Sequence, residues 1–151
     1  MLDTNEKILD VVANADILFW PVAMDTKYDD VRAMPDGHMD VCFFNGSIRN
    51  SEAKEIAELL RRKSKVMVAL GSCAHLGGIP ALANLWDRDA IFKDVYLDNP
   101  STENPDGVVP KVSSGHNGQT LSLPGFYQTV RSLDQVTSVD YYIPGCAPTP
   151  N

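Results

Sequence analysis

Short apolar segments recur along the chain, and most of them end at a proline, a glycine or an Asn-Gly pair. Four of them are Ile17–Trp20, Val41–Phe44, Val66–Leu70 and Val139–Ile143. They are largely apolar on both faces and rich in β-branched and aromatic residues, which is typical of parallel strands buried between helix layers. We therefore expect each of them to form a strand of one parallel sheet.

Helical patterns alternate with these segments. The clearest covers residues 51–63, where Ser51 or Asn50 provides the cap, the first turn is acidic and the last turn is basic. Its apolar residues recur with helical spacing: Ala53, Ile56, Ala57 and Leu60. Shorter helices are expected from Thr4 to Asn14, over 80–85 and 88–95, and from Pro124 through Phe126, Val130 and Leu133. Residues 98–125 are rich in Pro, Gly, Ser and Asn and predict a long loop with a short strand pair.

This alternation predicts an α/β fold with a doubly wound parallel sheet, in one domain over residues 1–151. Hydrophobic residues make up 44% and charged residues 22%, which excludes a wholly disordered chain. The net charge of −7 argues against nucleic acid or an anionic membrane as the main partner. Each apolar run is far shorter than the roughly 20 residues that span a bilayer, and the polar start of the chain does not resemble a signal peptide.

The three cysteines, Cys42, Cys73 and Cys146, cannot all pair with one another, which favours a reducing compartment such as the cytoplasm. Cys73 and Cys146 each follow a predicted strand, with glycines beside them. Because functional groups gather outside the carboxyl ends of parallel strands, we expect both thiols at one edge of the sheet, as ligands or as buried small side chains. Cys42 lies in the middle of a predicted strand, where a packing role is expected.

Three segments around two of the cysteines carry a resemblance to a known family. They are Gly71-Ser72-Cys73-Ala74, Gly77-Gly78-Ile79-Pro80-Ala81 and Pro144-Gly145-Cys146-Ala147-Pro148. These segments resemble the small subunits of NiFe hydrogenases, a family that also contains the matching subunit of respiratory complex I. Further segments resemble the methyl-viologen-reducing branch, which supplies electrons to heterodisulfide reductase: Asp16–Val22, Val41–Arg49 and Leu133–Val136.

The resemblance covers nearly the whole chain and implies a flavodoxin-like domain that holds a proximal 4Fe-4S cluster on four cysteines. The third and fourth ligands of that set match Cys73 and Cys146. Four neighbouring residues are expected to border the cluster: Gly46, Ser47, Ser72 and Gly145. Ser47 is expected either to donate a hydrogen bond to a cluster sulfur or to cap the following helix, and Arg49 either to offset the cluster charge or to form a surface ion pair.

The sequence also departs from the family pattern. The first two ligands of the family form a Cys-x-x-Cys-Glu segment after the first strand, and the sequence contains no such segment. The domain is therefore expected to lack its first strand and to be incomplete at both ends. His75 is a possible substitute ligand, although its side chain could equally point elsewhere. In the sheet order 2-1-3-4-5 the first strand is central, so we expect unpaired strand edges and a marginally stable monomer.

The resemblance implies an electron-transfer subunit. The large subunit of a NiFe hydrogenase would split hydrogen, and a downstream subunit such as heterodisulfide reductase would accept the electrons. The missing thiolates favour an alternative, a cluster-free fragment that acts only as an interaction module. A flavin carrier is a third possibility that suits the fold, although the fold alone is not evidence for it.

Overall fold

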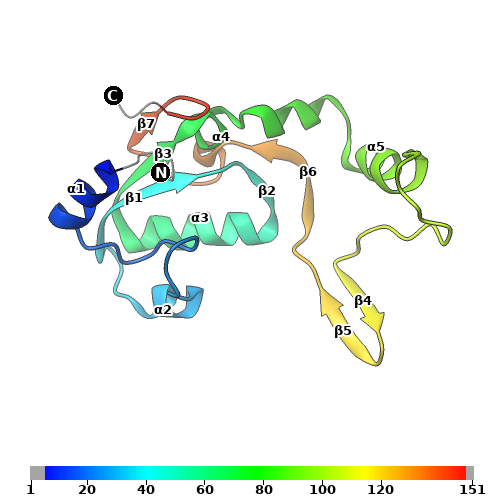
Figure 1. Ribbon diagram of the computed structural model, residues 1–151, viewed down its shortest axis with the longest axis horizontal. Coiled ribbons are helices and arrows are strands. Elements are labelled where there is room, and N and C mark those ends of the chain that lie inside the picture. Colours follow the sequence, from blue (N-terminus) through cyan, green and yellow to red (C-terminus); the bar gives the residue numbers. More distant parts are fainter. Residues whose placement is uncertain (1–5, 149–151) are drawn as a thin grey trace.

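The computed structural model describes residues 6–148, and its centre is a three-stranded parallel sheet (Figure 1). The strands are β1 (Met39–Asn45), β3 (Ser64–Leu70) and β7 (Tyr141–Ile143), in the order β1-β3-β7. Val41 lies opposite Val66 in one ladder, and Val68 lies opposite Tyr141 in the other. The predicted α/β fold with a parallel sheet is thus confirmed.

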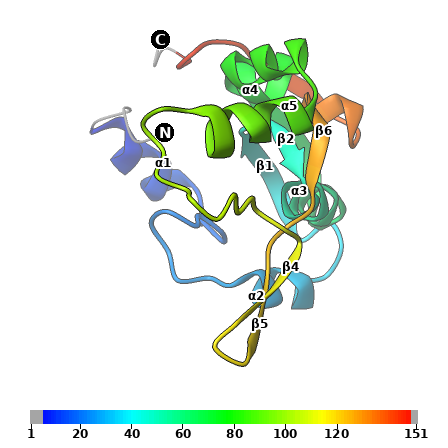
Figure 2. The ribbon, with the colours of Figure 1, turned by 90° about the vertical axis from the view of Figure 1, so that its right-hand side faces the viewer.

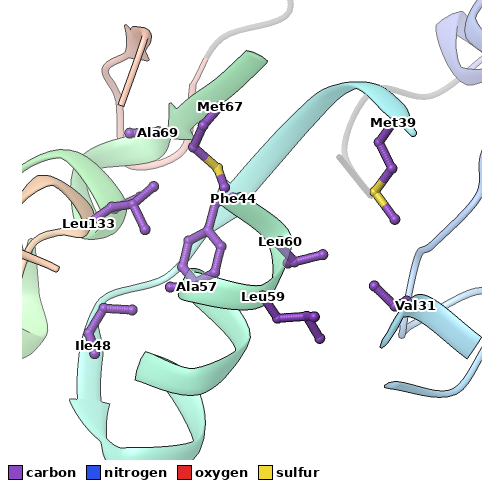
Figure 3. Close-up of a cluster of buried hydrophobic side chains, with 11 residues drawn as sticks. Val31, Met39, Phe44, Ile48, Ala57, Leu59, Leu60, Met67, Ala69 and Leu133 are labelled. Carbon is purple, nitrogen blue, oxygen red and sulfur yellow. The ribbon is translucent and has the colours of Figure 1, made fainter. Parts of the chain in front are cut away.

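Helix α3 (Ser51–Lys63) connects β1 to β3 and covers one face of the sheet (Figure 1). Asn50 is its cap, since its side-chain oxygen accepts a hydrogen bond of 2.8 Å from the Ala53 N–H. The core lies between this helix and the sheet, where Phe44 and Met67 are directed towards Ala57 and Leu60 of the helix (Figure 3). The helix predicted over residues 51–63 is therefore confirmed, as is the burial of its apolar face.

The opposite face of the sheet is much less covered. Val41 and Phe43 alternate along β1 with the half-buried Cys42 and the buried Phe44, and they are 46% and 47% exposed. Since successive side chains of a strand point to opposite faces, this alternation shows that α3 buries one face only. The packing role predicted for Cys42 is confirmed, because its side chain packs against the core on the α3 side.

Shorter elements surround this centre. They are α1 (Lys7–Asn14), α2 (Tyr28–Ala33), β2 (Ile48–Asn50), α4 (Gly71–Leu76), the 3-10 helix η2 (Ile79–Leu85), α5 (Arg88–Lys93), the π-helical turn η3 (Asp94–Asp98), β6 (Phe126–Arg131) and the 3-10 helix η4 (Leu133–Gln135). Strands β4 (Ser113–His116) and β5 (Gln119–Ser122) form a hairpin that projects from the body (Figure 2). This hairpin confirms the strand pair predicted within residues 98–125. Among the described helices, none is long and apolar enough to cross a membrane.

The helix predicted from Pro124 to Leu133 is wrong. Residues 126–131 form β6, which pairs antiparallel with β2, and only a short 3-10 turn follows at Leu133. The segment Phe-Tyr-Gln-Thr-Val-Arg is rich in aromatic and β-branched residues, which favour an extended backbone once a partner strand is present. The helix expected from Thr4 begins at Lys7 within the described residues, and Thr4 itself lies outside them.

The strand predicted at Ile17–Trp20 is also wrong, since these residues are not part of any ladder. In the order 2-1-3-4-5, the observed strands β1, β3 and β7 correspond to strands 3, 4 and 5. The segment Ile17–Trp20 would then be strand 2, which pairs with strand 1 in that order. Within residues 6–148 no strand lies along the outer edge of β1. The segment therefore has no ladder to join, although Leu18 and Phe19 pack against the core.

Candidate functional site

The loops that follow β1, β3 and β7 meet at Gly71. A Cβ atom at Gly71 would lie 3.4 Å from the Gly145 carbonyl oxygen, 3.7 Å from Cδ of Pro148 and 3.8 Å from Nδ2 of Asn45. The Ser72 N–H also donates a hydrogen bond of 2.8 Å to the Gly145 carbonyl. The expectation that the two cysteine loops leave the sheet at one edge is therefore confirmed.

Cys73 lies in the first turn of α4, directly after β3, and its side chain is half-buried. The Gly77-Gly78 turn wraps around it. The Gly77 N–H donates a hydrogen bond of 3.0 Å to the Cys73 carbonyl, and a Cβ at Gly78 would lie only 2.8 Å from Sγ of Cys73. Gly78 has φ +57° and ψ −150°, a backbone conformation essentially restricted to glycine. A glycine at position 78 is thus needed for this turn to pack against the thiol.

Cys146 follows β7 and is exposed. Its loop folds back tightly, since a Cβ at the preceding Gly145, whose φ is +131°, would lie 2.6 Å from Cα of Pro148. Cys42 differs from both, because burial in the core raises the pKa of its thiol to about 11. Cys42 therefore remains a protonated thiol near neutral pH. Unlike Cys73 in α4 and Cys146 in the loop after β7, it does not lie at the carboxyl edge of the sheet.

The other residues predicted to border a cluster lie near these loops. Gly46 directly follows β1 with φ +105° and open space beside its Cα. Ser47 does not cap α3, because that position is taken by Asn50, so the capping interpretation of Ser47 is wrong. The Ser72 N–H is engaged with the Gly145 carbonyl, which leaves the Ser72 hydroxyl as its remaining donor.

His75 lies two residues beyond Cys73 on α4 and stacks on Tyr142 of β7, with ring centroids 4.7 Å apart. Its Nδ1 is buried and has no hydrogen-bond partner among the described residues. The Tyr142 hydroxyl donates a 3.2 Å hydrogen bond to Asp134. Burial together with the Asp134 charge raises the pKa of the Tyr142 hydroxyl. Over residues 6–148, no group of three or more His, Cys, Asp or Glu side chains is arranged to hold a metal ion.

The sequence predicts that Arg49 offsets a cluster charge or forms a surface ion pair. Within the described part of the chain it forms no ion pair, and its guanidinium instead lies over the Phe126 ring at 4.6 Å from the centroid. Sequence reasoning misses this contact because it places Phe126 in a helix. The signal that could have indicated this contact is Phe126, an aromatic residue in the strand that pairs with β2.

The parallel order β1-β3-β7, with α3 connecting its first two strands, is that of a flavodoxin-like α/β protein, and the Cys73 and Cys146 segments meet at the carboxyl edge of this sheet. The family described as NADH ubiquinone oxidoreductase, 20 Kd subunit, matches residues 1–151, and the chain belongs to this family.

Curated relatives include the iron-sulfur subunit of the F420-non-reducing hydrogenase of Archaeoglobus profundus, which is 40% identical over 98% of this chain and 46% of the relative. The corresponding F420-non-reducing hydrogenase subunit of Methanothermobacter thermautotrophicus is 42% identical over 97% of this chain and 43% of the relative. The chain thus spans about half the length of these two curated relatives. These relatives confirm the resemblance to the small subunits of hydrogenases.

A solved structure supports the same relationship. The NAD+-reducing [NiFe]-hydrogenase in the H2-reduced state contains a chain that matches with a TM-score of 0.79 and 26% identity. The match covers 98% of this chain and 74% of that chain. Almost all of the fold described above is therefore shared with a subunit of a hydrogenase.

Proposed function

We propose that the chain forms part of the electron-transfer subunit of a NiFe hydrogenase complex. The observation that carries the proposal is the meeting of the Cys73 and Cys146 loops at Gly71, at the carboxyl edge of the sheet. The relatives reported above are named as hydrogenase subunits, and one of them as an iron-sulfur subunit. Two cysteines placed in this way, in a family of this kind, favour a metal–sulfur site over a purely structural role.

Cys73 and Cys146 would supply two of the four thiolates that a 4Fe-4S cluster takes, and such a cluster would accept and release single electrons when bound. The site fits this role in part. Its loops are held in register by the Ser72–Gly145 hydrogen bond, and Gly78 leaves no room for a side chain beside Cys73. The described residues provide two thiolates in these loops and no larger ligand group, so the remaining ligands would come from elsewhere.

The surrounding residues would orient these thiolates and tune them. Gly46 and Ser47 follow β1, and Ser72 and Gly145 precede the two cysteines in sequence. In this proposal these four residues would offer donors to cluster sulfur. Hydrogen bonds to sulfur and the exclusion of water are the means by which a protein sets the potential of such a centre. In this proposal the chain itself needs no acid–base or nucleophilic chemistry.

The proposal includes two partners. A NiFe large subunit would split hydrogen, and a downstream subunit, such as a heterodisulfide reductase, would accept electrons. A cytoplasmic location belongs to the same proposal, since all three cysteines are free and a reducing compartment keeps them so.

The experiment is anaerobic purification of the protein with its partner subunits, followed by iron and sulfide analysis and electron paramagnetic resonance of the reduced sample. The proposal predicts a cluster signal that disappears in Cys73→Ser and Cys146→Ser variants and persists in Cys42→Ser. A cluster-free interaction module is the second candidate, favoured by the presence of only two thiolates in the described loops. Iron-free protein that still binds a large subunit would establish that alternative, and flavin absorbance would indicate a flavin carrier.

A further inference from the structure

Arg49 is a partly buried cation for which the described structure provides no counter-charge. It lies on β2, and its guanidinium covers the Phe126 ring of the paired strand β6 at 4.6 Å. Its Nε and Nη1 atoms are buried and have no hydrogen-bond partner among residues 6–148. Buried donors of this kind are normally satisfied, because an unpaired buried polar group raises the free energy of the folded state.

The electrostatic surroundings of Arg49 agree with this geometry. Burial lowers the pKa of its guanidinium, and no acidic group of the described chain opposes that effect. Two other arginines have acidic partners: Arg32 binds Glu55 at 2.7 Å, and Arg61 binds Asp140 at 2.6 Å. A buried charge is stable when it is paired, so Arg49 is the group in this region that requires an anion from outside the described chain.

The chain segment that contains Phe126, the ring beneath the Arg49 guanidinium, indicates what kind of molecule brings that anion. The segment from Val112 to Val130, which includes the β4–β5 hairpin and Phe126, contains no Asp, Glu, Lys or Arg, although the whole chain has 13 basic and 20 acidic residues. Val112, Leu121 and Leu123 are 61%, 48% and 52% exposed, and Figure 1 shows the hairpin extending away from the body below β6. Depletion of charge together with exposed apolar and aromatic side chains is typical of the core of a protein interface.

We propose that Arg49 receives a carboxylate from the large subunit of the hydrogenase, as a charged anchor of an interface that is rich in apolar and aromatic side chains. The partner rests on the proposed function. A planar guanidinium matches a carboxylate in shape and charge, and the pair would lie in a site from which the neighbouring apolar surface excludes water. A second copy of this chain is a poorer occupant, because two chains of net charge −7 repel each other.

Arg131 offers a matched control for the test. It lies on β6 opposite Ile48 of β2, and its guanidinium also stacks on an aromatic ring, at 5.3 Å from the centroid of Tyr127. In contrast to Arg49, its side chain has no buried unpaired nitrogen among the described atoms. Methionine at either position retains an unbranched side chain that packs on an aromatic ring while removing the charge.

The experiment measures two properties of Arg49→Met and Arg131→Met variants: binding of the full protein to the large subunit from the same organism, and thermal unfolding of each protein without partner. We expect Arg49→Met to weaken binding at least about tenfold and to unfold at the same or a higher temperature than the wild type. Arg131→Met should leave binding within about threefold. Arg49→Lys, which keeps the charge but not the planar fork, should bind with intermediate affinity.

The outcomes separate this inference from the proposed function. If the wild type does not bind the large subunit, both the proposed function and the Arg49 inference fail. If the wild type binds and Arg49→Met binds equally well, the inference alone is overturned. Two further results would also overturn it: an Arg49-dependent thermal shift on addition of inorganic phosphate, which would indicate a free-anion site, and an Arg49-dependent dimer in sedimentation.

Discussion

Gly78 is the position at which a single methyl group should disturb the cysteine loop most directly. In a Gly78→Ala variant the new Cβ would lie 2.8 Å from Sγ of Cys73 and 3.0 Å from both Cα and N of the same residue. Rotation of the thiol cannot relieve the two main-chain contacts, so the backbone of α4 or of the Gly77-Gly78 turn has to move. Overpacking of this kind typically costs about 1–3 kcal/mol. The glycine-only backbone conformation of Gly78 adds about 1–3 kcal/mol of strain for alanine.

Gly46→Ala is the matched control, because Gly46 has φ +105° but no atom within 4 Å of the position that a Cβ would take, so it carries the backbone cost without the contact. Urea unfolding of both variants should show that Gly78→Ala lowers the free energy of unfolding by about 1–3 kcal/mol more than Gly46→Ala. The rate at which a thiol reagent labels Cys73 should rise in Gly78→Ala and stay unchanged in Gly46→Ala. Equal stabilities and equal labelling rates in the two variants would refute the packing of this turn against Cys73.

Three further predictions concern the scaffold. At about pH 8 a thiol reagent should label the exposed Cys146 before Cys42, because the pKa of about 11 keeps the Cys42 thiol protonated. Mass spectrometry can follow the two labelling rates, and equal rates in the folded protein would contradict the burial of Cys42. Hydrogen bonds from the Met67 N–H and from Arg61 lower the pKa of the Asp140 carboxyl in the folded protein. The ionised carboxylate should therefore stabilise the fold above its unfolded pKa of about 4, and this stabilisation should be lost as the pH falls through its lower pKa in the folded protein. The difference in urea midpoint between wild type and Asp140→Asn should accordingly shrink below about pH 4, and a difference that grows there would have the wrong sign. Asn50→Ala should cost about 0.5–2 kcal/mol through loss of the α3 cap, whereas Ser47→Ala should cost clearly less in the same unfolding assay.

The sequence predicted those parts of the fold whose stability comes from burial between β1, α3 and β3. Val41–Phe44 and Val66–Leu70 are apolar enough to indicate strands by themselves, and both form the sheet. Ile17–Trp20 has the same composition but forms no strand, because a strand exists only where a neighbour completes its ladder. Composition alone carries no information about that neighbour.

The candidate site likewise has features that could be predicted from the sequence and features that could not. The shared edge of Cys73 and Cys146 could be predicted, since it follows from strand direction alone. The contact of Arg49 with Phe126 and the stacking of His75 on Tyr142 could not, because each joins elements that only tertiary packing brings together. The first of them depends on β6, a strand stabilised by its pairing with β2 rather than by a strong local pattern.

We propose that Cys73 and Cys146 are cluster ligands of a hydrogenase subunit. Electron paramagnetic resonance of the anaerobically reduced protein, assembled with its partner subunits, tests it directly when the three single Cys→Ser variants are compared with the wild type. We expect one cluster signal to be lost in both Cys73→Ser and Cys146→Ser and to be unchanged in Cys42→Ser, whose side chain packs against the core. An unaltered set of signals in both Cys73→Ser and Cys146→Ser would contradict it.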